Sequence, residues 1–201
     1  MTLFQDISSN PLITLSIWVD EARLKGIIDP EAMTLTTVSE EQAPTVRAVL
    51  CKKIDPLKGI YFFTNYNSHK AQQLVKNPKV CAHFLWTSLA RQIRLDGIAR
   101  KISREESETY FATRPRESQI GAWASPQSEA ITDFQWLTSR VERYTAEFGS
   151  EKPVPCPPHW GGFLIEPQMI EFWEGKIGRV HDRVRLSRDH SGSWQRQQIA
   201  P

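Results

Sequence analysis

The sequence has 201 residues, of which 40% are hydrophobic, and its 25 basic and 23 acidic side chains leave a formal net charge of +2. This length is enough for one domain with a real core, and the balanced charge gives no reason by itself to expect a nucleic-acid ligand. The sequence contains no run of about 18 apolar residues and no secretion signal, so we expect a cytoplasmic protein without a membrane span.

The cysteines and histidines do not indicate a metal site. Cys51, Cys81 and Cys156 are widely spaced and form no Cys-x-x-Cys pair, which fits a reducing compartment. Cys156 and His159 have the spacing of half a metal site, but the sequence offers no second half. We therefore expect no bound metal.

The first half of the chain is predicted to contain one long helix followed mainly by strands. Asn10 and Pro11 supply an N-cap and a first-turn proline for the helix, Gly26 ends it, and residues 1–9 are expected to be flexible. A second, short helix is predicted over Ser68–Val75. Alternating patterns rich in β-branched residues predict the strands Ala32–Val38, Thr45–Lys53, Ile60–Thr64, Val80–Trp86 and Gln92–Ile102.

The second half of the chain mixes helices with closing strands. Ser103 and Glu106 form a capping box for a helix that runs through Phe111. Phe134–Phe148 has the apolar spacing of an amphipathic helix, and Gly149 ends it. The predicted strands are Trp160–Ile165, Met169–Trp173, Val180–Leu186 and Trp194–Ile199.

This order of elements indicates a single α+β domain over residues 1–201. Most of the roughly nine strands are joined by short turns, which favours antiparallel pairing in a barrel or a sandwich. The last strands are too few to form a core of their own. The helices are therefore expected to lie around the periphery of one sheet structure.

Residues 110–118 contain an unusual set of hydrogen-bond donors. Tyr110, Arg114 and Ser118 are spaced four and four, so on a helical path they form one stripe, which Pro115 would kink. A phenol, a guanidinium and a hydroxyl together suit an anion such as a phosphate monoester. The alternative is a solvated helix with an unpaired Arg.

Two further stretches place cations where an anion would stabilise them. Arg47 and Lys52 lie on a strand near a β-rich core, where unpaired cations are costly. Lys70 lies in the first turn of the helix that Ser68 caps, and a helix N-terminus is a phosphate site by its free N–H groups and dipole. The alternatives are strand ends in solvent and a surface lysine.

The last such pattern is Arg179-Val-His-Asp-Arg183. On a strand, the period of two places Arg179, His181 and Arg183 on one face. Three cationic or titratable groups in a row repel one another unless an anion or a π-system lies over them. The alternative is a solvated edge strand.

The motif Arg114-Pro-x-x-Ser-Gln-Ile-Gly-Ala-Trp, followed by Ser125-x-Gln-Ser128, resembles the central motif of the pyridoxine/pyridoxamine 5′-phosphate oxidase family. The resemblance runs from about Asn10 to Pro201. It implies a mainly antiparallel split β-barrel with peripheral helices, a homodimer, and FMN as cofactor. The implied activity is oxidation of pyridoxamine 5′-phosphate and pyridoxine 5′-phosphate to pyridoxal 5′-phosphate, with hydride transfer to FMN and reduction of dioxygen to hydrogen peroxide.

The resemblance also assigns site residues through its further motifs, among them Arg-x-Val-Leu-x-Lys, Phe-Thr-Asn and Arg-x-His-Asp-Arg. The implied FMN contacts are Arg47, Lys52, Phe63, Thr64, His69, Lys70, Gln92, Gln127, Ser128, Trp173 and Arg183. The implied substrate contacts are Lys52, Tyr110, Arg114, Ser118, Arg179 and His181. Arg179 and His181 are expected to be catalytic, because they would hold the substrate ring against the flavin.

The sequence departs from the family pattern at identifiable positions. His69 replaces an Arg, which predicts a weaker hold on the FMN phosphate at neutral pH. Cys51 replaces a Leu, a change that a buried position tolerates. Gln198 stands where the family has Arg near its end, and we expect the site to lack the family's N-terminal Arg-x-x-Tyr arm.

Three other functions remain open at this point. A related split-barrel flavin oxidase could act on another ring, such as a phenazine precursor, although that substrate needs no phosphate pocket. A flavin- or nucleotide-binding module without turnover would share the cofactor residues. A basic β-barrel could stack nucleic-acid bases on its aromatic residues, but the net charge of +2 weighs against it.

Overall fold

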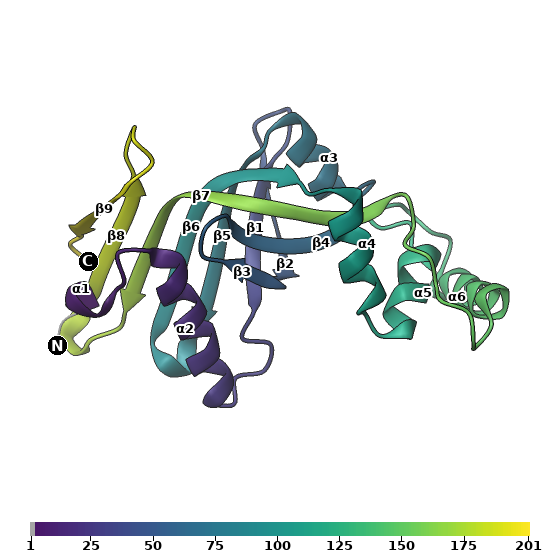
Figure 1. Cartoon of the computed structure of the whole chain (residues 1–201), viewed down its shortest axis with the longest axis horizontal. Coiled ribbons are helices and arrows are strands. Elements are labelled where there is room, and N and C mark those ends of the chain that lie inside the picture. Colours follow the sequence, from purple (N-terminus) through teal and green to yellow (C-terminus); the bar gives the residue numbers. More distant parts are fainter. Residues whose placement is uncertain (1–2) are drawn as a thin grey trace.

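The computed structural model describes residues 3–201 (Figure 1), and the described strands form one 9-stranded sheet in which every pairing is antiparallel. The helices are α1 Leu3–Asp6, α2 Pro11–Leu24, α3 His69–Lys76, α4 Arg104–Ala112, α5 Arg116–Ala124 and α6 Phe134–Phe148, with 3₁₀ turns at Thr87–Leu89 and Ile177–Arg179. The strands are β1 Ala32–Val38, β2 Pro44–Leu50, β3 Lys53–Asp55, β4 Gly59–Asn65, β5 Lys79–Trp86, β6 Arg91–Lys101, β7 Trp160–Glu174, β8 Asp182–Arg188 and β9 Trp194–Gln198.

The long strand β7 determines how the sheet is divided. It pairs with β6 along nearly its whole length, while β4 pairs with its first half and β8 with its second half. The sheet order β2-β1-β5-β6-β7-β4-β3 therefore has a branch at β7, from which β8 and β9 extend. The predicted fold class, an α+β protein with a mainly antiparallel split β-barrel and peripheral helices, is confirmed.

A bulge allows β7 to continue through a proline. The register between β6 and β7 shifts between Asp96 and Gly97, where Gly97 lies opposite Pro167. A proline has no N–H for the ladder, so it is tolerated in a strand at such an irregularity. A Cβ atom on Gly97 would lie 2.5 Å from the carbonyl oxygen of Glu166, so this close approach of two backbones requires glycine.

The main core lies between α2 and the sheet. The Asn10 side chain accepts a hydrogen bond from the N–H of Leu12, so the predicted cap begins the helix as expected. Trp18 of α2 packs edge-on against Phe172, at 5.2 Å between ring centroids, and against Trp86 at 6.5 Å. These contacts tie α2 to the last residues of β7 and the end of β5.

A second, smaller core lies at the other end of the molecule, where α4 and α5 meet the start of β7. Its buried members are Phe111, Ile120, Val154 and Trp160. Figure 1 shows α5 and α6 at this end and β8 and β9 at the opposite end. β7 therefore connects two separate packing centres.

Several predicted boundaries were wrong because the local sequence pattern does not show where a strand is interrupted or continues. Trp160–Ile165 and Met169–Trp173 are parts of the single strand β7. The predicted strand Thr45–Lys53 ends at Leu50, and Lys53 begins the separate strand β3. Residues 116–124, expected to continue the helical path after a kink, form the separate helix α5.

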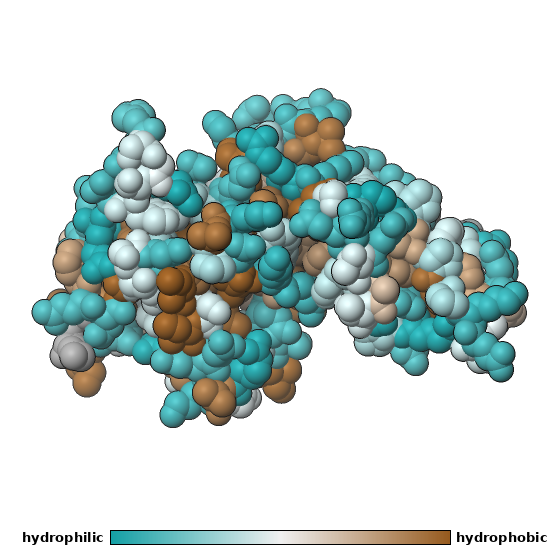
Figure 2. All heavy atoms as spheres, viewed as in Figure 1, coloured by the Kyte–Doolittle hydropathy of each residue, from teal (hydrophilic) through white to brown (hydrophobic). Residues whose placement is uncertain are grey.

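The amphipathic helix was predicted with the right bounds, but the described residues cover its apolar side only in part, where Tyr144 and Phe148 pack on Trp123. No side chain of α6 is buried, and Phe134 is 77% exposed. Figure 2 shows a mostly hydrophilic face with apolar patches, one of them over α2, whose Ile13 and Ile17 are exposed. Apolar side chains left open in this way on several elements suggest surfaces that another chain covers.

The expectation that residues 1–9 are flexible stays a prediction, and for residues 1 and 2 it lies outside the described residues. In the structure Leu3 and Ile7 are buried, and the Leu3 N–H donates to Asp182 at 3.0 Å. Arg196 of β9 donates to the carbonyl oxygen of Phe4. Within residues 3–201, none of the helices combines the length and apolarity that crossing a membrane would need.

Gly97→Ala is expected to destabilise the protein, because the added Cβ meets a backbone oxygen that cannot move alone. Overpacking of this kind costs about 1–3 kcal/mol, and each kcal/mol lowers Tm by about 2–4 °C in a domain of this size. Gly121→Ala is the control, since nothing lies within 4 Å of its added Cβ and alanine favours a helix. Thermal unfolding should show opposite shifts, and an unchanged Tm in Gly97→Ala would contradict the argument.

Candidate functional site

One cavity of about 230 Å³ brings together seven of the residues predicted for the site. β4 supplies two of them, α3 and α4 one each, and the others come from the connections around these elements. Ala48, Val49 and Leu50 at the end of β2, together with Trp160, complete the wall. The seven residues are Lys52, Phe63, Thr64, Lys70, Tyr110, Arg114 and Gln127.

Lys70 is held in place by a small set of oxygen acceptors. Its ammonium group lies 3.0 Å from the amide oxygen of Gln127, 3.1 Å from the hydroxyl of Thr64 and 3.3 Å from that of Ser68. The residue is only 8% exposed. Burial, with a smaller contribution from the positive charge of Arg47, lowers the pKa of Lys70 from 10.5 to about 8.

Arg47 lies beside this lysine and is fixed by neighbouring strands. Its Nη1 donates to the carbonyl oxygen of Leu35 at 3.0 Å and to the hydroxyl of Thr37 at 2.7 Å, and its Nη2 donates to the hydroxyl of Thr45 at 2.7 Å. Burial lowers its pKa. Arg47 and Lys70 are therefore two cations in one desolvated region, neither of which has an ion-pair partner among residues 3–201.

Arg114 carries an unsatisfied buried donor in the cavity wall. Its guanidinium lies 4.7 Å from the centre of the Trp160 ring and 5.5 Å from that of Phe111. Its Nη1 is buried and has no hydrogen-bond partner among the described residues, and burial lowers its pKa. A buried unpaired donor on a cation is costly, so its presence in a cavity wall points to an anionic ligand.

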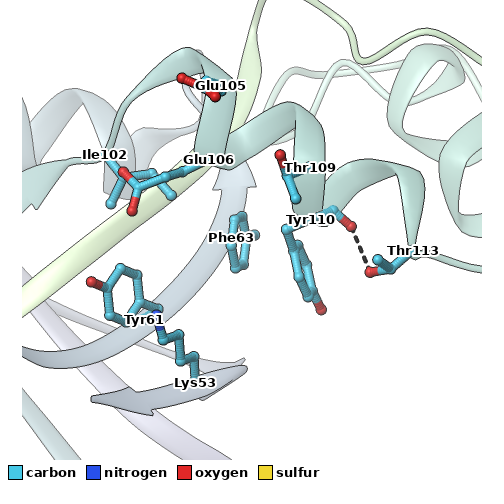
Figure 3. Close-up of a pocket in the computed structure, with 9 residues that line it drawn as sticks. All are labelled: Lys53, Tyr61, Phe63, Ile102, Glu105, Glu106, Thr109, Tyr110 and Thr113. Carbon is cyan, nitrogen blue, oxygen red and sulfur yellow. Dashed lines mark hydrogen bonds between the residues drawn. The ribbon is translucent and has the colours of Figure 1, made fainter. Parts of the chain in front are cut away.

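Tyr110 separates this cavity from a second one. Its ring stacks on Phe63 with centroids 3.8 Å apart, and both residues line a neighbouring space of about 490 Å³ (Figure 3). The helix α4 that carries Tyr110 begins with the predicted capping box of Ser103 and Glu106. Burial raises the pKa of the Tyr110 phenol, so it remains a hydrogen-bond donor at neutral pH.

Lys52 completes the cationic side of the cavity. It lies 3.7 Å from the carboxylate of Glu31, and its side chain is 31% exposed. Cys51 before it is buried, and burial raises the pKa of its thiol to about 12, which makes it an inert apolar side chain. Lys52 is thus the one cation of the cavity that has an ionic partner in the described part of the chain.

A second group of predicted residues lies across β6, β7 and β8. Gln92 is opposite Trp173, and Trp173 is opposite Arg183, so the three form a row on adjacent strands. The Gln92 amide oxygen lies 3.1 Å from Nε2 of His83. His181 lies against Trp173 with ring centroids 4.7 Å apart, so it joins this row.

The expectation that Arg179, His181 and Arg183 share a strand face was wrong. β8 begins only at Asp182. Gly178 and Arg179 have positive φ angles of 77° and 61°, which turn the chain out of the extended conformation. Arg179 is exposed in this turn, whereas His181 and Arg183 are half-buried near Trp173.

Five predicted residues do not line the cavity or lie in the row. Arg47 lies beside Lys70 but is not part of the cavity wall, and Arg179 lies in the turn before β8. The other three are His69, Ser118 and Ser128. His69 is exposed at the start of α3 and borders a shallow hollow next to Glu40 and Glu41. Ser118 is half-buried in α5, and Ser128 is exposed in a turn with φ 76°. Their predicted roles stay predictions.

The cavity and the row lie far apart in the same chain. Trp160 borders the cavity and Trp173 lies in the row, and both belong to β7. The 13 residue steps from Trp160 to Trp173 correspond to roughly 40 Å along the extended strand. The cavity is also smaller than the roughly 300–1,000 Å³ of a typical ligand pocket.

Sequence reasoning missed one residue of the cavity wall, Trp160, and one residue that supports it through Lys70, Ser68. Trp160 stacks under the guanidinium of Arg114, but the sequence indicated only the start of a strand there. Ser68 was predicted as a helix cap, but its hydroxyl accepts from Lys70 and makes no side-chain cap bond. An aromatic residue at the start of a strand after a proline-rich loop was the only available signal for Trp160.

Comparison with known proteins agrees with the motifs. Residues 19–147 match the model of the pyridoxamine 5′-phosphate oxidase family, and residues 160–201 match that of the pyridoxine 5′-phosphate oxidase C-terminal dimerisation region. The chain belongs to this family. Membership makes it a flavin-dependent oxidase, and the predicted family is confirmed. The first 18 residues and the loop before β7 lie outside the matched ranges.

Individual relatives support this assignment. A protein named pyridoxine/pyridoxamine 5′-phosphate oxidase from Microcystis aeruginosa (strain NIES-843 / IAM M-2473) is 47% identical over 199 residues, which are 99% of this chain and 92% of that protein. The crystal structure of PhzG from Burkholderia lata 383, in complex with tetrahydrophenazine-1-carboxylic acid, has a TM-score of 0.92 and 26% identity, covering 98% of this chain and 96% of that one.

A third comparison concerns the fold alone. A pyridoxamine 5′-phosphate oxidase-related, FMN-binding protein from Nostoc punctiforme PCC 73102 has a TM-score of 0.76 and 16% identity, covering 94% of this chain and 96% of that one. The split-barrel architecture of the oxidase therefore extends to proteins with little sequence in common with it.

The lowered pKa of Lys70 predicts a pH-dependent stability of the ligand-free protein. Between about pH 8 and 10.5 the unfolded chain holds this proton and the folded chain does not, so stability should rise with pH. We expect Tm to increase by a few degrees over this range, since each kcal/mol corresponds to about 2–4 °C.

Lys70→Met should lose this rise and should be the more stable protein near pH 7. Thermal unfolding of both proteins from pH 7 to 10 is the measurement, with Lys76→Met as the control because Lys76 is an exposed partner of Glu40. Parallel curves for wild type and Lys70→Met would contradict the burial argument.

Proposed function

We propose that this oxidase binds FMN and oxidises pyridoxamine 5′-phosphate and pyridoxine 5′-phosphate to pyridoxal 5′-phosphate, with dioxygen as electron acceptor. The single observation that carries the substrate class is the buried Nη1 of Arg114, which has no partner within residues 3–201. Tyr110 lies next to it and can donate a second hydrogen bond. A phosphate monoester would satisfy both donors and neutralise the guanidinium.

The residues around Lys70 fit the phosphate of FMN. Lys70 and Arg47 are two desolvated cations without an ionic partner in the described chain, and Thr64 adds a hydroxyl. Ser68 precedes helix α3, whose first-turn N–H groups favour an anion. The two phosphates, of cofactor and substrate, therefore have separate sets of donors that share one cavity.

The row of Gln92, Trp173 and Arg183 fits the flavin ring. It offers an amide, an indole and a guanidinium on adjacent strands, which suit the polar edge and the face of an aromatic ring system. A ligand the size of FMN does not span the roughly 40 Å of β7 between the row and the cavity. We therefore propose a homodimer whose sites each combine the cavity of one chain with the row of the other.

Within such a site the chain's own residues have distinct tasks. Flavin would accept the hydride from the substrate and pass the electrons to dioxygen, so the protein needs to orient and to supply charge. Arg114, Tyr110 and Lys52 would fix the substrate through its phosphate and ring substituents. His181, held against Trp173, would contact the substrate ring from the partner chain, and Arg179 would reach it from the adjacent turn.

A second candidate function is supported by the similarity to PhzG, which was crystallised with a phenazine carboxylic acid. A carboxylate could also pair with Arg114. Arg114 and Tyr110 are partly buried donors and Lys52 adds a second positive charge. Two cations favour the doubly charged phosphate over a singly charged carboxylate. The 47% identity to a protein named as the phosphate oxidase, against 26% to PhzG, favours the same choice.

The direct test is oxygen consumption by the FMN-loaded protein. We expect turnover of pyridoxamine 5′-phosphate, with formation of hydrogen peroxide, and little or none of pyridoxamine, which lacks the phosphate. Turnover of a tetrahydrophenazine carboxylic acid in preference to the phosphate ester would establish the second candidate instead. If the FMN-loaded protein is inactive on all three compounds, it is a non-catalytic flavin-binding module.

Arg114→Met is expected to raise KM for pyridoxamine 5′-phosphate by about 10- to 150-fold, since a charge-assisted hydrogen bond contributes about 1.5–3 kcal/mol. FMN affinity should change little. Arg100→Met is the control, because Arg100 only pairs with Glu166 at the surface. Steady-state kinetics and FMN titration measure the two effects, and an equal loss of both ligands would place Arg114 at the cofactor instead.

Mixing two variants, each impaired in one half of the site, tests the two-chain site. In a dimer of Arg114→Met with Arg183→Met, one site carries both substitutions and the other carries neither. Random pairing makes half of all dimers mixed, so about one quarter of the sites should be intact. Co-expressed, purified protein should regain about one quarter of wild-type activity, whereas no recovery would mean that each site is formed within one chain.

A further inference from the structure

Glu171 is a nearly buried carboxylate in the middle of the β6, β7 and β8 sheet. Its side chain is 7% exposed, and it stands on β7 two residues before Trp173, on the same face. Its cross-strand neighbours are Arg94 on β6 and Arg185 on β8. No role has been assigned to Glu171 so far, although burying a charged side chain is costly unless it is paired.

The Glu171 carboxylate binds two guanidinium groups, one with each oxygen. Oε1 accepts from Nε and Nη2 of Arg183, at 3.2 and 2.6 Å, and Oε2 accepts from Nε and Nη2 of Arg185, at 3.1 and 2.8 Å. Burial alone would raise the pKa of Glu171, but these hydrogen bonds lower it overall, so the carboxylate stays ionised. Two cations share one anion, and the cluster keeps a net positive charge.

The end of the chain holds Arg183 from the other side. Its Nη1 donates to the carbonyl oxygen of Ala200 at 2.9 Å, and the N–H of Ile199 donates to the Arg183 carbonyl oxygen at 2.9 Å. Three of the five N–H groups of the guanidinium are thereby used. One N–H on each Nη remains for a ligand, and the plane of the group is fixed by its contacts on two sides.

The other cations of the site are held differently. Arg47 and Lys70 are bound by neutral oxygen acceptors. Arg114 has an Nη1 with no partner among the described residues, and Lys52 has one carboxylate at 3.7 Å. Arg183 therefore differs in being set in advance by an ionised partner and by the backbone. Such preorganisation is useful where a ligand group must be met in one orientation, because no side chain has to be ordered when the ligand binds.

We propose that Glu171 is a positioning residue for the cofactor: it orients Arg183 so that its two remaining N–H groups meet the flavin, and it does not contact the ligand itself. This inference rests on the proposed function, in which Arg183 binds FMN. Arg185 is the second support of the carboxylate and holds Glu171 in place. The carbonyl oxygen of Ala200 completes the clamp.

The test is a double-mutant cycle read by titration of the apoprotein with FMN. Glu171→Gln leaves the shape but places a neutral amide against two donors, and we expect it to weaken FMN binding by about 10- to 100-fold. In an Arg183→Met background the same substitution should change the affinity by less than about 2-fold, since the group it positions is gone. In an Arg185→Met background its effect should persist.

A second readout separates positioning from charge. Removing a carboxylate near the flavin would by itself make reduction easier, whereas losing an oriented guanidinium would make it harder. We expect the flavin midpoint potential of Glu171→Gln to fall. A rise would overturn the proposal, as would an equal loss of FMN affinity in the Arg183→Met background, because then Glu171 acts by its charge or by general stability.

Two further variants keep the test decisive. Glu166→Gln is the matched control, since Glu166 lies on the same strand and pairs only with exposed Arg100; its FMN affinity should equal that of wild type. Glu171→Asp keeps the charge but moves the carboxylate oxygens away from the two guanidinium groups, so it should also weaken FMN binding. It replaces Glu171→Gln in the test if that variant does not fold. Wild-type FMN affinity in Glu171→Asp would overturn the inference, whereas wild-type protein that binds no FMN would overturn the proposed function instead.

Discussion

The continuity of β7 is the constraint on which the rest of the structure depends. One 15-residue strand contributes to the core under α2 and to the small core beside α4, and its two halves pair with different strands on one edge. This continuity survives Pro167 because a bulge opposite Gly97 removes the need for its N–H. The same continuity separates the cavity from the row of Gln92, Trp173 and Arg183, and this separation is the basis of the proposed site shared by two chains.

Desolvated cations connect the fold to the chemistry. Lys70, Arg47 and Arg114 all have lowered pKa values because they are buried, and none has an ionic partner in the described part of the chain. A folded protein tolerates this cost where a ligand offsets it. The ligand-free state is thus less stable than the same fold with its anions bound, and binding of cofactor and substrate should raise stability by mass action as well as prepare the reaction.

Much of the fold could be predicted from the sequence, because its signals are local. The Asn10 cap, the capping box at Ser103 and the Gly149 stop each act within one helical turn, and all three boundaries agree with the structure. The break after Leu50 and the continuity of β7 depend on which strands lie alongside, and no local pattern carries that information. The failed period of two at Arg179 has the same origin, since a left-handed turn interrupts a stretch whose composition suits a strand.

The site residues likewise fall into those that the sequence identified and those whose role depends on the folded structure. Residue types and motifs identified the cations of the cavity, because an anion site needs those groups wherever the chain places them. They did not identify Glu171 or Trp160, whose importance comes from what lies across the strand or under the ring. Arg183 illustrates the difference: its charge can be read from the sequence, but its orientation results from a carboxylate 12 residues earlier and a backbone carbonyl 17 residues later. A guanidinium held on both sides acts as a fixed donor, and that property exists only in the folded chain.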